Sequence, residues 1–551
     1  MAGHGSKPLR GLVSTQQSSI QTGKFGRMFR WLEPCFPAQS PVDELAVEAV
    51  CKSLAKLMVS SEFDGNVDGK HHDTPDSDIL TPEPADENPT IPAGYTYFGQ
   101  FIDHDITFDP ASSLQQQNDP DALEDFRTPR LDLDSVYGRG PADQPYLYAR
   151  ATDPAKHSDR SKFVLGENRG IGMMNRPDVQ RSTDGTAIIG DKRNDENKIV
   201  VQIQALFLKF HNKVFDQIAP SFTAGQDTAH FAETQRIVRW CYQWLVLSDF
   251  LPKICDQTTV ADIMPSATQR KPNFKFYGPH NGDAFIPVEF SVAAYRFGHS
   301  MVRPSYALND VAKSNSKFKS HAGKTTGFAR IPIFVREAKD PTDAMNGFGE
   351  FSAGLPPQWG IDWSFFFGTL ASIPPNQKQV PQPSYRIDTT LVDPLGKLPE
   401  FARPGGVSPF ESLAFRNLLR GHSMGLPSGQ SVAEMIGVQT VLSDAQLWSQ
   451  KADGDVINAW PEGTQLLATN AKWLQGKAPL WFYILKEAEI LHQGHHLGEV
   501  GSRIVAETLI GLVWYDHYSY LFQKPKWTPA DEDIVGLDEH LDMLALTKFV
   551  G

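Results

Sequence analysis

Cysteine is scarce in this sequence, and its scarcity excludes several classes of protein. The four cysteines are Cys35, Cys51, Cys241 and Cys255, and no Cys-x-x-Cys pair occurs. Zinc ribbons, thioredoxin-type redox motifs and c-type haem attachment are therefore excluded. Cys241 and Cys255 fall in a segment that reads as one helix, which would hold them about 20 Å apart along its axis. A disulfide cannot span that distance. The cysteine content fits the cytosol, and a cysteine-poor exported enzyme is also compatible with it.

The sequence also has no run of apolar residues long enough to cross a membrane, which takes about 18 residues. The apolar segment Leu509–Trp514 is far shorter than this. Residues 1–40 carry scattered lysine and arginine but no apolar h-region, so we expect no secretory signal there. On these grounds the protein could reside in the cytoplasm or leave the cell without a signal peptide.

Positive charge is in the minority, because 52 Lys and Arg residues face 65 Asp and Glu residues, giving a formal net charge of −13. This balance repels polyanions, so we predict no nucleic-acid partner. Small anionic substrates are not excluded, since one local arginine can override the mean field.

Glycine and proline are plentiful, with 43 and 40 residues, and they predict long irregular connections. Apolar residues at helical spacing predict an amphipathic helix over Pro41–Ser60. Strand signals are few and short. We therefore predict a mainly α-helical fold, with an N-terminal extension over residues 1–90 and one large domain over residues 91–551. The strongest helix predictions cover residues 200–215, 231–254, 480–491 and 502–521.

The segment YFGQFIDHDITFDP (97–110) gathers acids around one histidine. On a helix, Gln100 and His104 are four residues apart and share a face. Asp103 and Asp105 flank the histidine, each turned about 100° away from it. Asp103 could thus lie beside the group that His104 addresses, while Asp105 points elsewhere. A hydrogen-bonded histidine in a polar turn would show the same pattern.

Three further segments carry candidate functional residues. In TPRLDLDSVYG (128–138), Asp132 and Asp134 alternate as oxygen ligands of a hard cation do, although a solvated turn has the same composition. In GDKRNDEN (190–197), Arg193 and Glu196 are three residues apart, a spacing also found at charged helix N-termini. In EFSVAAYRFGHSMVRP (289–304), His299 lies in an apolar helical pattern, where a buried core histidine is the common alternative.

Together these segments resemble the animal-type haem peroxidases of the cyclooxygenase–myeloperoxidase superfamily, and we interpret the chain as a bacterial-type member. The resemblance runs from about Tyr95 to Ile510, implies a helical bundle around a buried haem b, and makes residues 91–551 the haem peroxidase domain. It implies that His104 exchanges protons with hydrogen peroxide and that His299 ligates the iron. The other implied roles belong to Gln100 at the distal water and halide position, Arg193 as distal arginine, Asp103 and Glu196 as ester links to haem, Asn417 as acceptor of the His299 Nδ1 proton, and Arg296 and Arg420 near the haem propionates.

The resemblance also implies calcium in the second segment, and it shows two departures from the family. Many family members have serine where this chain has Asp134, and myeloperoxidase itself has a methionine where this chain has Asn197. We therefore expect no sulfonium link to haem and poor chloride oxidation. The implied calcium ligands are Asp105, Thr128, Arg130 through its carbonyl, Asp132 and Asp134.

The function implied is a haem peroxidase that reduces hydrogen peroxide and oxidises small organic donors or halides, with bromide, iodide and thiocyanate favoured over chloride. Such an enzyme would serve the response to oxidative stress. A fatty-acid oxygenase of the same superfamily is the first alternative, but its radical tyrosine lies three residues before the proximal histidine, where this chain has Arg296. Tyr295 lies four residues before His299, and on an α-helix this is about 100° around the axis from the position of the radical tyrosine. The second alternative is a haem-free binding scaffold.

Overall fold

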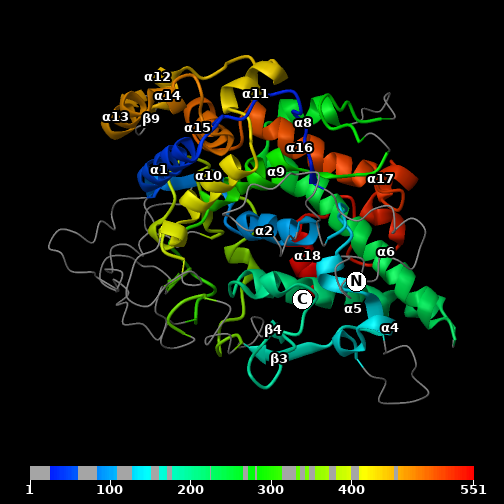
Figure 1. Cartoon of the computed structure of the whole chain (residues 1–551). Coiled ribbons are helices and arrows are strands. Elements are labelled where there is room, and N and C mark those ends of the chain that lie inside the picture. Colours follow the sequence, from blue (N-terminus) through cyan, green and yellow to red (C-terminus); the bar gives the residue numbers. More distant parts are fainter. Residues whose placement is uncertain are drawn as a thin grey trace, which may run out of the picture.

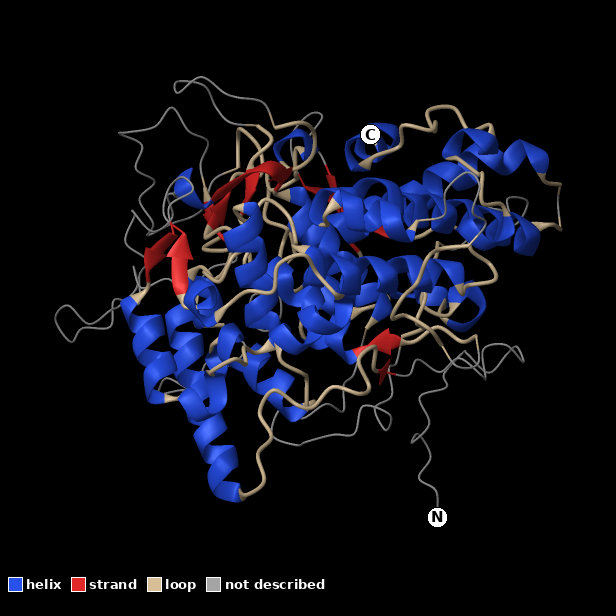
Figure 2. Ribbon diagram, turned by 90° about the horizontal axis from the view of Figure 1, so that it is seen from above, coloured by secondary structure: helices blue, strands red, loops and turns tan. Residues whose placement is uncertain are grey.

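A computed structural model describes residues 25–59, 84–107, 127–149, 161–169, 176–223, 225–264, 271–279, 282–312, 330–335, 342–346, 354–370, 380–398, 409–451 and 457–551. Helices dominate these residues and the strands are short (Figure 1, Figure 2). The mainly α-helical fold predicted from the sequence is confirmed.

The helices of the described residues are α1 (Pro41–Met58), α2 (Gly94–Ile106), α3 (Asp134–Tyr137), α4 (Gly140–Asp143), α5 (Val200–Ile218), α6 (Asp227–Trp244), α7 (Leu251–Ile254), α8 (Gln257–Ile263), α9 (Val288–Val292), α10 (Leu413–Ser423), α11 (Gly429–Ile436), α12 (Asp444–Leu447), α13 (Pro461–Thr469), α14 (Ala471–Leu474), α15 (Leu480–His492), α16 (Glu499–Trp514), α17 (Tyr520–Gln523) and α18 (Met543–Val550). None of them has both the length and the apolar composition needed to cross a bilayer.

Within the described residues, the strands form five two-stranded pairs, of which the first is parallel and the others antiparallel. They are β1 (Phe25–Gly26) with β5 (Ile286–Pro287), β2 (Glu87–Pro92) with β8 (Pro383–Tyr385), β3 (Leu165–Arg169) with β4 (Arg176–Val179), β6 (Ser305–Tyr306) with β7 (Ile331–Pro332), and β9 (Ser449–Lys451) with β10 (Ile457–Ala459).

Helix α2 lies near the centre of the molecule, with α5 below it and α9 and α10 above it in Figure 1. Its apolar face is held by an aromatic cluster. Phe101 stacks on Phe207 of α5 with ring centroids 4.8 Å apart, and both rings meet the edge of Tyr242 from α6. All three side chains are fully buried, and truncating a buried phenylalanine typically costs about 3–5 kcal/mol. The cluster therefore fixes the direction of the face of α2 that carries Gln100 and His104.

The helix predicted over residues 231–254 is present and is continuous from α6 to α7. Its middle is a π-helical turn, Leu245–Phe250, which the sequence pattern does not indicate. Asp249 in this turn is buried and accepts hydrogen bonds from the Tyr95 hydroxyl of α2 at 2.9 Å and from the Met543 amide at 2.9 Å. A carboxylate in the widened turn thus anchors the start of α2 and of α18.

Two other predicted helices differ in extent from the structure. The helix expected over residues 502–521 ends at Trp514, and α17 starts only at Tyr520. The segment containing His299 is not one helix. It consists of the short α9 and a 3₁₀ turn, η11 (Ala294–His299), because Ala293 leaves helical geometry at φ −129° and ψ −72°. His299 therefore belongs to the 3₁₀ turn and not to α9.

The predicted N-terminal helix is present as α1, which packs against α10 through its buried face. Ser40 caps α1 by accepting a hydrogen bond from the Asp43 amide. Of the extension predicted over residues 1–90, only 25–59 and 84–90 lie within the described residues. All four cysteines are buried and free of disulfides, as the sequence predicted.

Candidate functional site

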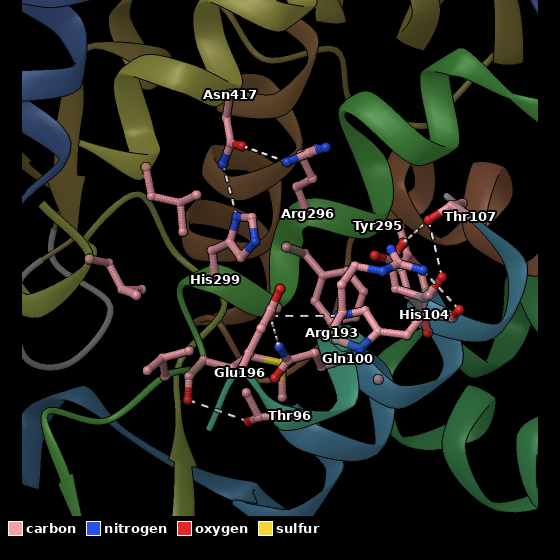
Figure 3. A pocket seen from close by; sticks show the side chains of 18 of the residues that line it. Thr96, Gln100, His104, Thr107, Arg193, Glu196, Tyr295, Arg296, His299 and Asn417 are labelled. Atoms are coloured by element: carbon pink, nitrogen blue, oxygen red, sulfur yellow. Dashed lines mark hydrogen bonds and ion pairs between the residues drawn. The ribbon is translucent and has the colours of Figure 1, made fainter. Parts of the chain in front are cut away.

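A cavity of about 500 Å³ lies between α2 and the segment formed by η11 and α10 (Figure 3). Segments distant in sequence meet here. In Figure 3, His299 and Asn417 are on one side of the pocket and His104 and Thr107 on the other. The predicted site residues that line it are Gln100, Asp103, His104, Arg193, Glu196, Arg296, His299, Asn417 and Arg420.

His104 is held in one orientation by a residue that sequence reasoning missed. Its Nδ1 lies 2.8 Å from Oδ1 of Asn194, and the Asn194 amide nitrogen donates to Oε1 of Gln204 at 2.8 Å. Since the Asn194 oxygen can only accept, the proton of neutral His104 sits on Nδ1 and Nε2 is left with a lone pair. Burial, assisted by the charge of Arg193, lowers the pKa of His104 to about 3. His104 is thus a neutral imidazole able to accept a proton at Nε2.

Arg193 lies beside His104 in a 3₁₀ turn, η8 (Lys192–Asp195). Its Nη2 donates to the carbonyl of His104 at 2.9 Å and to Oδ2 of Asp191 at 2.8 Å. Asp191 also caps the turn by accepting from the Arg193 amide. Although burial opposes it, the charges of Arg193 and Arg127 hold the pKa of Asp191 well below its usual range. Arg193 is therefore held by a charged carboxylate.

The predicted residues Gln100 and Glu196 are in direct contact. Gln100 Nε2 donates to Glu196 Oε2 at 2.7 Å, and that oxygen lies 3.7 Å from His104 Nε2. Asn197 fixes the amide of Gln100, because its Nδ2 donates to Gln100 Oε1 at 3.1 Å. The side-chain oxygen Oδ1 of Asn197 accepts from the backbone amides of Ile199 and Val200 at the start of α5. Asn197 thus caps α5 and orients the side chain of Gln100.

Asp103 also lines the cavity, beside Thr107, whose hydroxyl donates to Asp103 Oδ1 at 3.1 Å. Burial raises the pKa of Asp103, and the charges of Arg193 and Arg296 oppose the shift.

On the opposite side, His299 contacts Asn417 as expected, with 2.9 Å between His299 Nδ1 and the amide nitrogen of Asn417. The direction differs from the prediction, in which Asn417 accepts the Nδ1 proton. Here the Asn417 oxygen accepts from Arg296 Nη1 at 2.9 Å, so the amide nitrogen faces the imidazole. Burial, with the nearby Arg296 charge, lowers the pKa of His299 to about 3. His299 is a neutral imidazole at the cavity wall.

The lining of the cavity fits a haem. Four arginines contribute positive charge, Arg193, Arg296, Arg416 and Arg420, against the two carboxyl groups of Asp103 and Glu196. An excess of guanidinium groups suits a ligand that carries carboxylates. Leucine and valine side chains supply apolar wall for a flat ring, and His299 supplies a nitrogen for iron. In addition, the buried hydroxyl of Tyr295, which lines the same cavity, has no hydrogen-bond partner among the described residues.

A second predicted site lies behind α2, where carboxylate oxygens of Asp105, Asp132 and Asp134 all lie within 4.8 Å of one another. The Thr128 hydroxyl donates to Asp132 Oδ2 at 2.7 Å, and the Leu133 amide donates to Asp105 Oδ2 at 3.0 Å. Burial raises the pKa of Asp134 to about 7, despite the opposing charge of Arg127. Oxygen ligands gathered in this way can hold a hard cation such as calcium.

Arg130, the fifth predicted member of this set, directs its side chain elsewhere, with Nε 3.8 Å from Asp516 Oδ1. Its predicted role uses the backbone carbonyl and does not depend on that side chain. Arg127, which the sequence reasoning did not single out, contacts Asp134 at 3.2 Å. No local sequence pattern indicates a role for Arg127. Asp191 and Asn194, in contrast, lie close to Arg193 within residues 190–197, a segment that the sequence analysis singles out.

Comparisons with known proteins found peroxidases among the proteins similar to this chain. A family model described as animal haem peroxidase matches residues 116–349. Thyroid peroxidase from Canis lupus familiaris is 25% identical over 362 residues, covering 63% of this chain and 33% of the relative. A peroxidase-like protein from Margaritifera margaritifera is 26% identical over 389 residues, covering 60% of this chain and 44% of the relative. The chain thus spans less than half the length of either relative.

Solved structures share the fold over most of the chain. Peroxidase A from Dictyostelium discoideum aligns with a TM-score of 0.58 at 15% identity, covering 98% of this chain and 97% of that one. A fatty acid alpha-dioxygenase from Oryza sativa aligns with a TM-score of 0.54 at 13% identity, covering 89% and 88%. Over residues 116–349 the chain thus matches the animal haem peroxidase family, and over most of its length it shares the fold of solved peroxidase and dioxygenase structures.

Proposed function

We propose that the protein is a haem peroxidase that reduces hydrogen peroxide and oxidises small organic donors or halides. The observation that carries the proposal is the pairing of two neutral imidazoles at one cavity, with Arg193 beside His104. When bound, the haem supplies the iron at which peroxide is reduced and passes the oxidising equivalents to the donor. His299 is proposed as the iron ligand through Nε2, with its proton on Nδ1, which requires the Asn417 amide to present its oxygen to Nδ1 when haem is bound. Arg296 and Arg420, which line the same cavity, are proposed to meet haem carboxylates.

The protein's own part in peroxide reduction is proton transfer and charge stabilisation. Nε2 of His104 carries the lone pair, because Asn194 holds the proton on Nδ1. It takes a proton from one peroxide oxygen and returns it to the departing one, acting first as base and then as acid. The guanidinium of Arg193 stabilises negative charge that develops on the departing oxygen. Without His104, we expect the reaction with peroxide to slow by about 10²–10⁴-fold.

The finer features of the proposal concern attachment, donors and calcium. Asp103 and Glu196 are the carboxyl groups proposed to form esters with haem, since both line the cavity. Asn197 offers no thioether for a sulfonium link, so bromide, iodide and thiocyanate are favoured over chloride. Calcium is proposed at the acidic cluster behind α2, where its ligands are Asp105, Thr128, Arg130 through its carbonyl, Asp132 and Asp134.

A fatty-acid oxygenase is the second candidate, favoured by one observation. Tyr295 lines the cavity and its buried hydroxyl has no hydrogen-bond partner among the described residues. Against this role, Arg296 occupies the position three residues before His299, and in a 3₁₀ turn Tyr295 is rotated about 120° from His299. Oxygen uptake in the presence of a long-chain fatty acid, measured without peroxide, separates the two functions.

The test compares His104→Ala, His299→Ala and the exposed control His540→Ala, each reconstituted with haem. We expect the His299 variant to lose its Soret band or its haem. The His104 variant should keep haem and lose peroxide-dependent oxidation of a phenol and of bromide. The control should match the unaltered protein. A chain that binds no haem, or a His104 variant with unchanged turnover, would refute the proposal.

A further inference from the structure

Arg127 lies between the acidic cluster and the residue that holds Arg193. Its Nη1 donates to Asp134 Oδ1 at 3.2 Å, and its Nη2 donates to Asp191 Oδ2 and to the carbonyl of Gly190 at 3.4 Å. The side chain is only 11% exposed, so water screens these contacts weakly. One guanidinium therefore divides its charge between a proposed calcium ligand and a carboxylate of the other site.

Asp191 is in turn shared by two arginines. It accepts from the backbone amide, Nε and Nη2 of Arg193, and from Nη2 of Arg127. Its side chain is 1% exposed, so nearly all its charge is balanced by these two groups. When one arginine is drawn closer to Asp191, the hold on the other weakens, because both compete for the same oxygen Oδ2. The position of Arg193 thus depends on whether the guanidinium of Arg127 lies closer to Asp134 or to Asp191.

We propose that Arg127 and Asp191 are positioning residues that couple cation binding at the acidic cluster to the setting of Arg193. A cation bound to Asp134 competes with Arg127 for that carboxylate. The guanidinium of Arg127 then moves toward Asp191, and the hydrogen bonds between Asp191 and Arg193 weaken. This connection between the two sites runs through side-chain contacts. It is separate from the connection along the backbone of α2, where Asp105 of the acidic cluster directly follows His104. The role of Arg193 in peroxide reduction rests on the proposed function, whereas the coupling does not.

Coupling between sites is reciprocal, so calcium affinity reports it without any turnover. We would titrate the haem-free protein with calcium against a chelator dye, for the unaltered chain, Arg193→Met, Arg127→Met and the double variant. Removing Arg193 should draw Arg127 to Asp191, free Asp134 and tighten calcium binding about fivefold, the lower end of typical couplings between sites. In the Arg127→Met background the same change should alter calcium affinity less than twofold.

Lys192→Met is the matched control, because Lys192 neighbours Arg193 in sequence but its side chain is exposed. It should leave calcium affinity unchanged. If Arg127→Met does not fold, Asp191→Asn takes its place and should equally abolish the effect of Arg193→Met. The proposal is overturned by absent calcium binding, by an Arg193→Met variant with unaltered affinity, or by an equal effect in both backgrounds. A haem-binding, peroxide-active protein without this coupling would refute the inference and leave the proposed function standing.

Discussion

Replacing Asn194 tests the tautomer assigned to His104 most directly. Asn194 is fully buried, and its oxygen is the acceptor at 2.8 Å from His104 Nδ1. Asn194→Leu has nearly the same shape but no acceptor. Asn194→Asp keeps an acceptor at that position and adds a negative charge. The two variants therefore separate the loss of the hydrogen bond from a general disturbance of the site.

The expected magnitude follows from the hydrogen bonds that are lost. A neutral hydrogen bond contributes about 0.5–1.5 kcal/mol net, and a buried polar group without a partner costs about 1–3 kcal/mol. In Asn194→Leu, His104 Nδ1 loses its acceptor and Gln204 Oε1 loses its donor. If the loss of the acceptor leaves the proton favouring Nε2 by about 1.4 kcal/mol, the reactive tautomer falls to about a tenth of the population. We expect an approximately tenfold slower reaction with peroxide and about 2 kcal/mol lower stability.

The assay is stopped-flow absorbance of the haem-loaded protein mixed with peroxide, repeated across pH, with haem content measured in parallel. Asn194→Asp should keep most of the rate at neutral pH. Its carboxylate should raise the pKa of His104, so the acid limb of the rate should move to higher pH. A rate for Asn194→Leu equal to that of the unaltered protein, at equal haem content, would show that Asn194 does not set the tautomer.

Three other predictions address the cap of α5, the proposed calcium site and His211, a buried histidine of α5. Asn197→Met should lower the free energy of unfolding by about 1–2 kcal/mol because α5 loses its cap, whereas Asn197→Ser should keep most of it; equal urea midpoints would contradict the capping role. Chelation should remove bound calcium and lower peroxidase turnover, with recovery on adding calcium; metal analysis without calcium would argue against the site. Burial lowers the pKa of His211 to about 3 from 6.5, so only the unfolded chain takes up this proton between those values and stability falls as pH falls. The stability advantage over His211→Gln should shrink by about 2 kcal/mol from pH 7 to pH 5, and a constant difference would show that the native state accepts the proton.

The sequence by itself was sufficient to place the residues that belong to one helical face. Gln100 and His104 share a face of α2 because they are four residues apart, and the aromatic residues on the other side of the same helix are those that pack on α5. The helix of residues 231–254 and the helix of residues 200–215 were likewise predictable, since the spacing of apolar side chains is a local property.

Contacts between distant segments were decided only by tertiary packing. Asn194 and His104 are 90 residues apart, and Asn417 and His299 are 118 apart. No periodicity encodes which atom of an amide meets an imidazole, and Arg296 decides this for Asn417 by occupying its oxygen. The break at Ala293 and the joining of Arg127 to Asp191 have the same origin. Local spacing determines which face a side chain takes, whereas the partner it meets depends on how buried charges and hydrogen bonds are satisfied across the whole core.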